Sequence, residues 1–172
     1  MSEQIRYAWG KSSLGTFIAA SSEQGLVVFE FSDDRDDTLE RLHGRFADAI
    51  ITEDADALGD TVAALSTAID HPERESDLAL DIRGTDYQKR VWALLRQIPA
   101  GSTTSYGAIA EQLGTRDARD ATEAIVSNSI AILIPCHRVV KKDGSLSGYR
   151  WGARRKRALL SREQQASEFK LS

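Results

Sequence analysis

The chain has 172 residues, of which 41 % are hydrophobic and 28 % are charged, as in a globular protein with one domain or two small ones. No apolar run approaches the roughly 18 residues that a membrane helix needs, and the N-terminal MSEQIRYAWG lacks the features of a secretory signal. The single cysteine excludes an internal disulfide, and the three scattered histidines give no zinc-type ligand spacing.

The net charge of −4 is divided unevenly along the chain. Residues 1–83 carry 7 basic and 18 acidic side chains, a net charge of −11, whereas residues 84–172 carry 15 and 8, a net charge of +7. This division predicts that only the second half meets a polyanion. A solvated acidic face beside a solvated basic face explains the same charges equally well.

The first half predicts an antiparallel sheet followed by two helices. Strand-like segments cover residues 4–10, 14–21 and 25–31, with the turn-rich KSS and SSEQG between them. Helical spacing and acidic starts mark residues 36–46 and 56–70. A polar linker containing a proline begins near His71, and residues 78–82 predict one more short strand.

The second half predicts a helix over residues 84–98, because Thr85 and Gln88 have the spacing of a capping box and an apolar stripe follows them. After a loop, two short helices are predicted at 106–114, which Gly114 would end, and at 115–128. Two short helices joined by a tight turn resemble a helix-turn-helix, although most such pairs bind no DNA.

A basic, partly amphipathic helix is predicted at residues 151–165. The residues after it have no apolar pattern, and Glu168-Phe169 and Lys170-Leu171 are residue pairs that two common cloning sites encode. We therefore expect residues 168–172 to be a vector-derived tail outside the fold.

The only cysteine, Cys136, follows an apolar run that ends at Pro135 and precedes His137 and Arg138, two groups that can stabilise a thiolate. Because a free thiol titrates near ~8.5, a reactive cysteine needs such a cation or base. Neighbours on a strand point to opposite faces. Pro135 favours an extended Ile134 and predicts that the strand ends here, so a turn or a bridging water can join sulfur and imidazole. A buried, inert cysteine with a chance histidine neighbour is the commoner alternative for an arbitrary pair.

The stretch NSIAILIPCHRVV, with Asn128 eight residues before Cys136, resembles the active-site signature of the O6-alkylguanine-DNA alkyltransferase family. LDIRGT…QKRVW, IPAGSTTSYGAIA and GSLSGYRWGARRKRALL are most similar to the C-terminal domain of Ada-type adaptive-response proteins. The resemblance implies an α/β (α+β) fold. A small ribonuclease-H-like domain with an antiparallel sheet would span residues 1–80, and a helical, winged helix-turn-helix-like domain with the active site would span 84–167.

The resemblance also implies five catalytic roles. Cys136 would be the nucleophile, His137 the general base acting through a water, and Glu163 the carboxylate that orients His137. Asn128 would be the hinge between recognition helix and active-site strand, and Tyr106 would donate its hydroxyl to the flipped base. Without the resemblance, these last three would be read as a surface glutamate, a helix-ending asparagine and a half-buried tyrosine.

Five further residues would contact DNA or substrate by the same resemblance. Arg119 would fill the gap left by the flipped base, whereas its ordinary reading is a solvated helix arginine. Val139 and Arg150 would offer backbone groups to the guanine, Tyr149 would form a wall of the pocket, and Ser105 would join the DNA-binding surface.

The implied reaction is DNA repair in a single turnover. Alkylated double-stranded DNA would bind through its minor groove to recognition helix 116–128, and the O6-alkylguanine, or O4-alkylthymine, would rotate out of the stack. Cys136 would take the alkyl group as a stable thioether, so each protein acts once. We expect a cytoplasmic monomer that needs no metal or organic cofactor.

Two features depart from the family pattern. Asp120 and Glu123 stand on the recognition helix where small residues are typical, and carboxylates there oppose phosphate binding unless they pair with Arg116 and Arg119. The nine basic residues between Arg138 and Arg162 compensate in part. The chain also lacks the cysteine-rich module of Ada-type proteins, as expected of a stand-alone repair protein or an excised domain.

Three alternative functions share features of this sequence. A self-labelling or DNA-weakened variant of the family would suit the acidic recognition helix. A cysteine hydrolase would need the same cysteine and histidine, but no caspase-type or papain-type signature surrounds Cys136. A non-catalytic damage sensor related to the family is disfavoured, because such proteins replace the cysteine.

Overall fold

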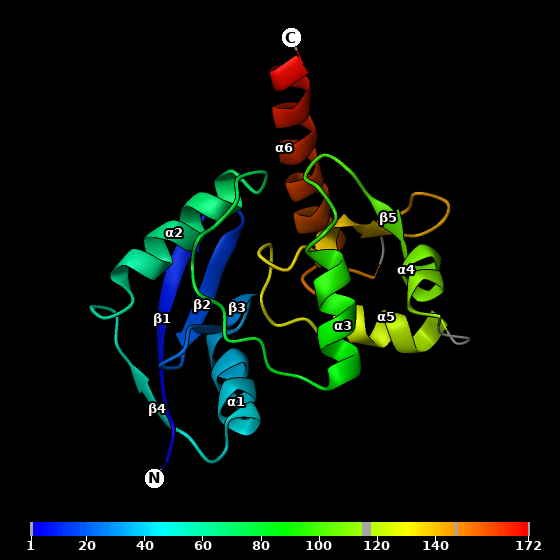
Figure 1. Cartoon of the computed structure of the whole chain (residues 1–172). Coiled ribbons are helices and arrows are strands. Elements are labelled where there is room, and N and C mark those ends of the chain that lie inside the picture. Colours follow the sequence, from blue (N-terminus) through cyan, green and yellow to red (C-terminus); the bar gives the residue numbers. More distant parts are fainter. Residues whose placement is uncertain (1, 115–117, 147, 172) are drawn as a thin grey trace. The chain divides into compact units, whose positions relative to one another are not determined.

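A computed structural model describes residues 2–114, 118–146 and 148–171 (Figure 1). The chain forms two compact units, residues 1–70 with 77–82 and residues 71–76 with 83–172. Among the described residues, no helix is both long enough and apolar enough to cross a membrane.

The first unit is built on a four-stranded sheet in the order β3-β2-β1-β4. Three strands form the predicted antiparallel meander, which the structure confirms: β1 Gln4–Ser12, β2 Gly15–Ser21 and β3 Leu26–Phe31. The fourth strand, β4 Ile50–Glu53, pairs parallel to β1 and was not predicted. It is short and lies at the sheet edge, so its sequence lacks the buried alternation that marks a strand.

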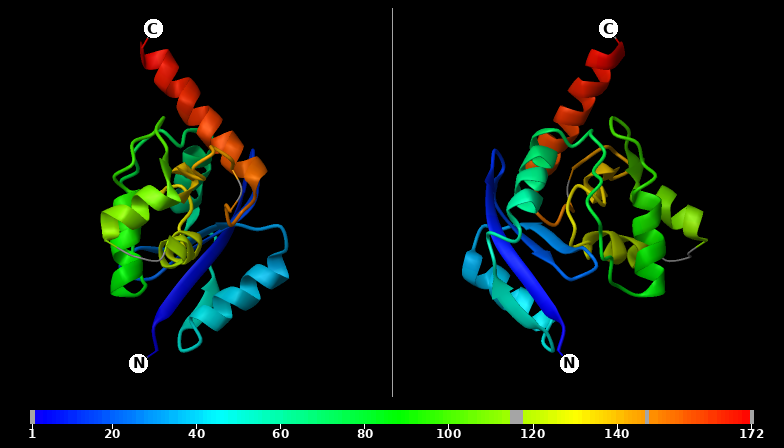
Figure 2. Two further views of the ribbon diagram at one scale, coloured as in Figure 1. Left: turned by 90° about the vertical axis from the view of Figure 1, so that its right-hand side faces the viewer. Right: turned by 60° about the vertical axis from the view of Figure 1, so that its left-hand side comes forward.

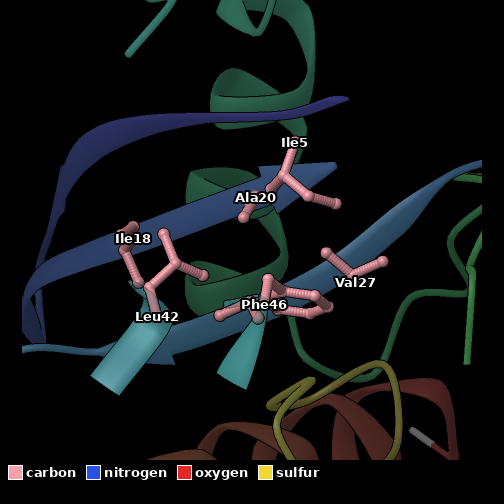
Figure 3. Packing of buried hydrophobic residues seen from close by; sticks show 7 residues of the cluster. Ile5, Ile18, Ala20, Val27, Leu42 and Phe46 are labelled. Atoms are coloured by element: carbon pink, nitrogen blue, oxygen red, sulfur yellow. The ribbon is translucent and has the colours of Figure 1, made fainter. Parts of the chain in front are cut away.

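Two helices accompany the sheet, α1 Arg35–Arg45 and α2 Gly59–Asp70. Both were predicted, although residues 55–58 form a turn before α2. Figure 3 shows side chains of β1, β2 and β3 gathered against Leu42 of α1 and Phe46, which follows that helix. The buried cluster consists of Ile5, Ile18, Ala20, Val27, Val28, Leu42 and Phe46.

The predicted strand at residues 78–82 is wrong. Only one bridge forms, between Leu26 and Leu80, supported by the hydrogen bonds Leu26 N to Ala79 O at 2.9 Å and Asp81 N to Leu26 O at 2.8 Å. The segment touches the edge of β3 at a single point, because it leaves the sheet before a ladder can form.

The described residues of the second unit form four α-helices, a three-residue 3₁₀ turn and a two-stranded parallel sheet. Its helices are α3 Asp86–Leu95, α4 Tyr106–Leu113, α5 Ala118–Val126 and α6 Ala153–Leu171. The two short strands are β5 Thr104–Ser105 and β6 Val139–Val140. The structure therefore confirms a mixed α/β fold with a sheet-bearing unit and a helical one.

Local signals placed the helix ends well. Thr85 and Gln88 form the predicted capping box at the start of α3. Gly114 ends α4 in the left-handed conformation, with φ of 68°, which a glycine adopts without steric cost. In both cases the signal lies within four residues of the helix end, so no distant contact was needed to predict it.

The strand that was predicted to end at Pro135 is also wrong. Residues 131–133 form turns, and Ile132 has a φ of 68°, which is rare for a β-branched residue. The Asn128 side chain donates to the carbonyls of Ile130 and Ile134 and accepts from the Ile130 N–H, and these hydrogen bonds hold the run. A short apolar run shows only that the segment is buried, and it does not distinguish a strand from buried turns.

Residues 168–171, which were expected to lie outside the fold, continue a helix. Helix α6 runs to Leu171, and both views in Figure 2 show its C-terminal turns projecting beyond the other elements of its unit.

Candidate active site

Cys136 is the first residue of the 3₁₀ turn Cys136–Arg138 and is only 4 % exposed. Asn128, directly after α5, donates from Nδ2 to its Sγ at 3.3 Å and to the Ile134 carbonyl at 2.9 Å. The Asn128 backbone carbonyl in turn accepts a hydrogen bond from Arg150 Nη1 at 2.9 Å. One buried amide thus joins the end of α5, the apolar loop and the thiol.

His137 and Glu163 form a fully buried pair. The His137 Nε2 lies 2.7 Å from Glu163 Oε1, and both side chains are 0 % exposed. A carboxylate oxygen can only accept here, so Nε2 carries the proton and Nδ1 is the nitrogen with a free lone pair. Within the described part of the chain, the buried Nδ1 has no hydrogen-bond partner. The geometry leaves it available to accept a proton.

Arg138 does not face the thiol, contrary to the expectation that it helps to stabilise a thiolate. Its Nε donates to Glu163 Oε2 at 2.8 Å, and its Nη2 donates to the same oxygen. Its remaining donors reach the backbone carbonyls of Ile98 and Pro72. Arg138 is close to Cys136 in sequence, but its side chain points elsewhere because the 3₁₀ turn directs consecutive side chains to different sides.

Lys156 is a site residue that the sequence reasoning missed. It is completely buried and donates from Nζ to the Val139 carbonyl at 2.5 Å. The same Nζ lies 5.7 Å from the centroid of the Tyr106 ring and 6.0 Å from that of Tyr149. Helical spacing was the available signal, since Lys156, Leu159 and Glu163 fall on one face of α6 and all three are buried.

Burial sets the protonation states of the thiol, the imidazole and the carboxylate. It raises the pKa of Cys136 to about 11, although the Asn128 hydrogen bond and the charges of Lys156 and Arg150 act to lower it. Burial also lowers the pKa of His137, and Glu163 only partly opposes this. For Glu163, burial would raise the pKa, but hydrogen bonds from His137 and Arg138 outweigh burial and lower it. At neutral pH the site therefore holds a thiol, a neutral imidazole and a carboxylate.

Two tyrosines near the thiol keep their protons. Burial, followed by the charge of Cys136, raises the pKa of Tyr106, and the same two causes raise the pKa of Tyr149 well above its ordinary value. The backbone passes close to Tyr106, since a Cβ placed on Gly148, where φ is +93°, would lie 3.1 Å from its hydroxyl oxygen. Both phenols can therefore act as hydrogen-bond donors.

Helix α5 presents a mixed-charge face to solvent. Arg119, Asp120 and Glu123 are exposed, whereas Ala121, Ala124 and Ile125 are buried. Trp92 of α3 fixes this orientation by donating from Nε1 to the Ala124 carbonyl at 2.8 Å. Arg116, the expected partner of Asp120, lies outside the described residues.

The remaining predicted site residues take structural positions around this centre. Ser105 caps α4, since its hydroxyl accepts a hydrogen bond from the Ala108 N–H at 3.0 Å. Val139 begins β6 and offers the carbonyl that Lys156 binds. In the described ranges, no group of three or more His, Cys, Asp or Glu side chains is arranged to hold a metal ion.

Comparison with known sequences identifies relatives of this chain. Residues 86–165 match the family model described as the DNA-binding domain of 6-O-methylguanine DNA methyltransferase. The chain is 43 % identical over 166 residues to the regulatory protein Ada of Salmonella typhimurium. The aligned residues cover 95 % of this chain and 47 % of Ada. It is 46 % identical over 114 residues to the methylated-DNA–protein-cysteine methyltransferase of Mycobacterium tuberculosis H37Rv. That alignment covers 66 % of this chain and 69 % of the mycobacterial protein. The chain thus spans about half the length of Ada.

A solved structure resembles the whole fold. The crystal structure of Mycobacterium tuberculosis OGT in complex with DNA superimposes with a TM-score of 0.77 at 38 % sequence identity, covering 93 % of each chain. The matched region includes both the sheet-bearing and the helical part of the fold, since 93 % coverage leaves out neither.

Proposed function

This chain belongs to the methylated-DNA–protein-cysteine methyltransferase family, and on that premise we propose that it repairs DNA by taking the alkyl group of O6-alkylguanine, or O4-alkylthymine, onto Cys136. One observation carries the proposal. The only thiol of the chain is buried in contact with Asn128 and is followed in the same turn by a histidine bound to a buried carboxylate. These groups suffice for transfer to sulfur.

The first step is removal of the thiol proton. Since burial raises the pKa of Cys136 to about 11, little thiolate exists at neutral pH and a base must act. The free Nδ1 of His137 takes the proton, through a water, and Glu163 stabilises the imidazolium that forms. Asn128 and the charge of Lys156 then stabilise the thiolate.

The second step is displacement at the alkyl carbon. A bond forms between Sγ and that carbon as the bond from the carbon to guanine O6 breaks, and the electron pair leaves with the purine. The Tyr106 hydroxyl donates to the departing base, where negative charge develops. The guanine anion takes up one proton, which balances the proton that His137 removed from the thiol, so the products are unmodified guanine, a thioether on Cys136 and a neutral His137. No group of the site can break that thioether, so the protein acts once and needs no cofactor.

The lesion must leave the double helix before either step, because the stack shields guanine O6. In our proposal, the helix within residues 116–128 enters the minor groove, Arg119 takes the place of the flipped base, and Ser105 lies at the DNA surface. Val139, Arg150 and Tyr149 hold the flipped base. Lys156 supports this arrangement by fixing the Val139 carbonyl.

The organisation of the chain follows the same proposal. We assign DNA binding and chemistry to residues 84–167 and a supporting ribonuclease-H-like role to residues 1–80, with residues 168–172 as a vector-derived tail. The protein would act as a cytoplasmic monomer.

A DNA-weakened or self-labelling variant of the same chemistry is a second candidate. The observation in its favour is the exposure of Asp120 and Glu123 beside Arg119 on α5, where they would face phosphates. Such a variant would keep the thiol chemistry and lose duplex affinity. Comparing transfer from a free-base substrate with transfer from an alkylated duplex separates the two candidates.

The number of turnovers tests the reaction class. With excess duplex containing O6-methylguanine, repaired guanine should accumulate to one equivalent per protein and then stop. Continued product formation beyond one equivalent would instead indicate a hydrolase. Alkyl transfer to the protein from a free-base substrate, without repair of the duplex, would favour the DNA-weakened variant.

A further inference from the structure

The two oxygens of Glu163 have different partners. Oε1 binds His137 Nε2 at 2.7 Å, whereas Oε2 accepts from both Nε and Nη2 of Arg138, with Nε at 2.8 Å. The carboxylate is completely buried, and the Arg138 side chain is 10 % exposed. A buried carboxylate with only one neutral partner would tend to protonate, so the guanidinium supplies the charge that keeps it ionised.

The rest of the guanidinium is fixed by backbone. Nη1 donates to the Ile98 carbonyl at 2.6 Å, and Nη2 also reaches the Pro72 carbonyl at 3.3 Å. Ile98 lies after α3, and Pro72 lies in the segment 71–76 that packs with the same unit. Arg138 is therefore held in one orientation by two distant segments of chain, and that orientation is the one that meets Glu163.

We propose that Arg138 is a positioning residue for the alkyl transfer proposed above: it holds Glu163 ionised and aimed at His137, and so keeps His137 able to accept the proton of Cys136. The planar fork is necessary, because one side chain must reach a carboxylate and two carbonyls in different directions. A lysine has the charge but offers a single nitrogen, so it cannot satisfy all three acceptors.

The charges around His137 give the proposal a measurable consequence. Glu163 and Lys156 face it from α6, and Arg138 faces it from its own turn. Glu163 raises the pKa of His137, whereas Arg138 and Lys156 lower it. Removing Arg138 takes a positive charge away from the coupled His137–Glu163 pair, so the pair takes up a proton at higher pH. With that proton bound, the pair has no carboxylate charge left to stabilise a further proton taken from Cys136.

Three variants of the full chain test this inference. Arg138→Met removes the charge and keeps much of the stem, and Arg138→Lys keeps the charge without the fork. Arg41→Met is the matched control, since Arg41 forms an exposed ion pair with Asp37 on α1 at 3.4 Å. Two readouts are followed against pH: the single-turnover rate on an O6-methylguanine duplex, and the NMR signals of the three histidine rings.

In Arg138→Met we expect a rate at neutral pH that is roughly 10- to 100-fold lower, as for other residues that orient a functional histidine. The acidic limb of the rate profile and the His137 titration should both move to higher pH. Arg138→Lys should give a smaller rate loss, and Arg41→Met should match the unmodified chain. A rate loss of equal size at every pH, with an unmoved His137 titration, would overturn the inference.

A double variant covers the case in which Arg138→Met folds poorly. In the Glu163→Gln background there is no carboxylate charge to hold, so adding Arg138→Met should lower the rate no further. A second, multiplicative loss would contradict the positioning role. The histidine titration needs no alkyl transfer, so it tests Arg138 even if the unmodified chain fails to repair the duplex, a result that would refute only the proposed function.

Discussion

Lys156 donates from a completely buried ammonium group to the carbonyl oxygen of Val139, the third residue after the cysteine. A buried ammonium is costly without partners, and besides that carbonyl it has two tyrosine rings and the nearby thiol. Its burial lowers its own pKa, and the thiolate form of Cys136 opposes that effect. The lysine and the thiol thus favour each other's charged forms.

Replacing Lys156 by methionine should therefore make the thiol harder to ionise. We expect the pKa of Cys136 to rise further and single-turnover transfer to slow by on the order of tenfold or more. The measurement is the rate of thiol alkylation by a small reagent against pH, together with the repair rate. Lys89→Met, on the exposed side of α3, is the matched control. An unchanged thiol profile would remove Lys156 from the site.

Glu163→Gln should slow transfer because the amide no longer stabilises a protonated His137. The loss of a positioned acid–base contribution typically costs on the order of a hundredfold or more. Duplex affinity, measured separately by titration of labelled DNA, should stay unchanged, since Glu163 is buried. A normal single-turnover rate would reduce Glu163 to a structural residue.

Folding stability should depend on His137 at acidic pH. Burial lowers its pKa in the folded state, so as pH falls the unfolded chain takes up a proton before the folded chain does. The free energy of unfolding should thus decrease as pH drops below about 6.5, the ordinary histidine value. Urea unfolding of the chain and of His137→Gln, at several pH values, measures this. If the free energy of unfolding decreases equally steeply in the chain and in His137→Gln, the pH dependence arises from other groups.

Replacing Asp120 by alanine and Glu123 by glycine together should raise duplex affinity, most clearly at low salt. Both carboxylates are exposed on α5, and removing two negative charges near phosphates strengthens an attraction that salt screens. Glycine loosens the helix by roughly 1 kcal/mol relative to alanine, so the folded fraction is checked first. Labelled duplex is titrated at two salt concentrations.

Transfer from a free-base substrate is the control for that variant, and it should stay nearly constant because it does not use the groove. Duplex affinity that fails to rise at low salt would mean that α5 does not dock on DNA as proposed, or that its acids point away from the phosphates.

Features fixed by local chemistry were predictable from the sequence. The caps of α3 and α4 depend on Thr85, Gln88 and Gly114, each within four residues of the helix end it controls. The meander of β1 to β3 follows from turn-rich segments between apolar ones. The roles given to Glu163 and Tyr106 came from resemblance alone, because nothing in their own spacing distinguishes them from ordinary helix residues.

Features that depend on distant partners were missed. Arg138 meets Glu163 across 25 residues and Pro72 across 66, so its orientation could not be read from its neighbour Cys136. The loop over 130–134 resembled a strand because the amide that folds it belongs to Asn128, outside the apolar run. Lys156 was counted among the cations that meet DNA, since charge alone favours exposure and only its partners explain its burial.

The destination of the alkyl group tests the central claim most directly. The chain is incubated with a duplex that carries one isotope-labelled O6-methylguanine, digested, and mapped by mass spectrometry, with Cys136→Ala treated in parallel. We expect the label on the peptide containing Cys136 and on no other, and a folded alanine variant that takes up only trace label. Label on another residue, or undiminished transfer by Cys136→Ala, would contradict the account.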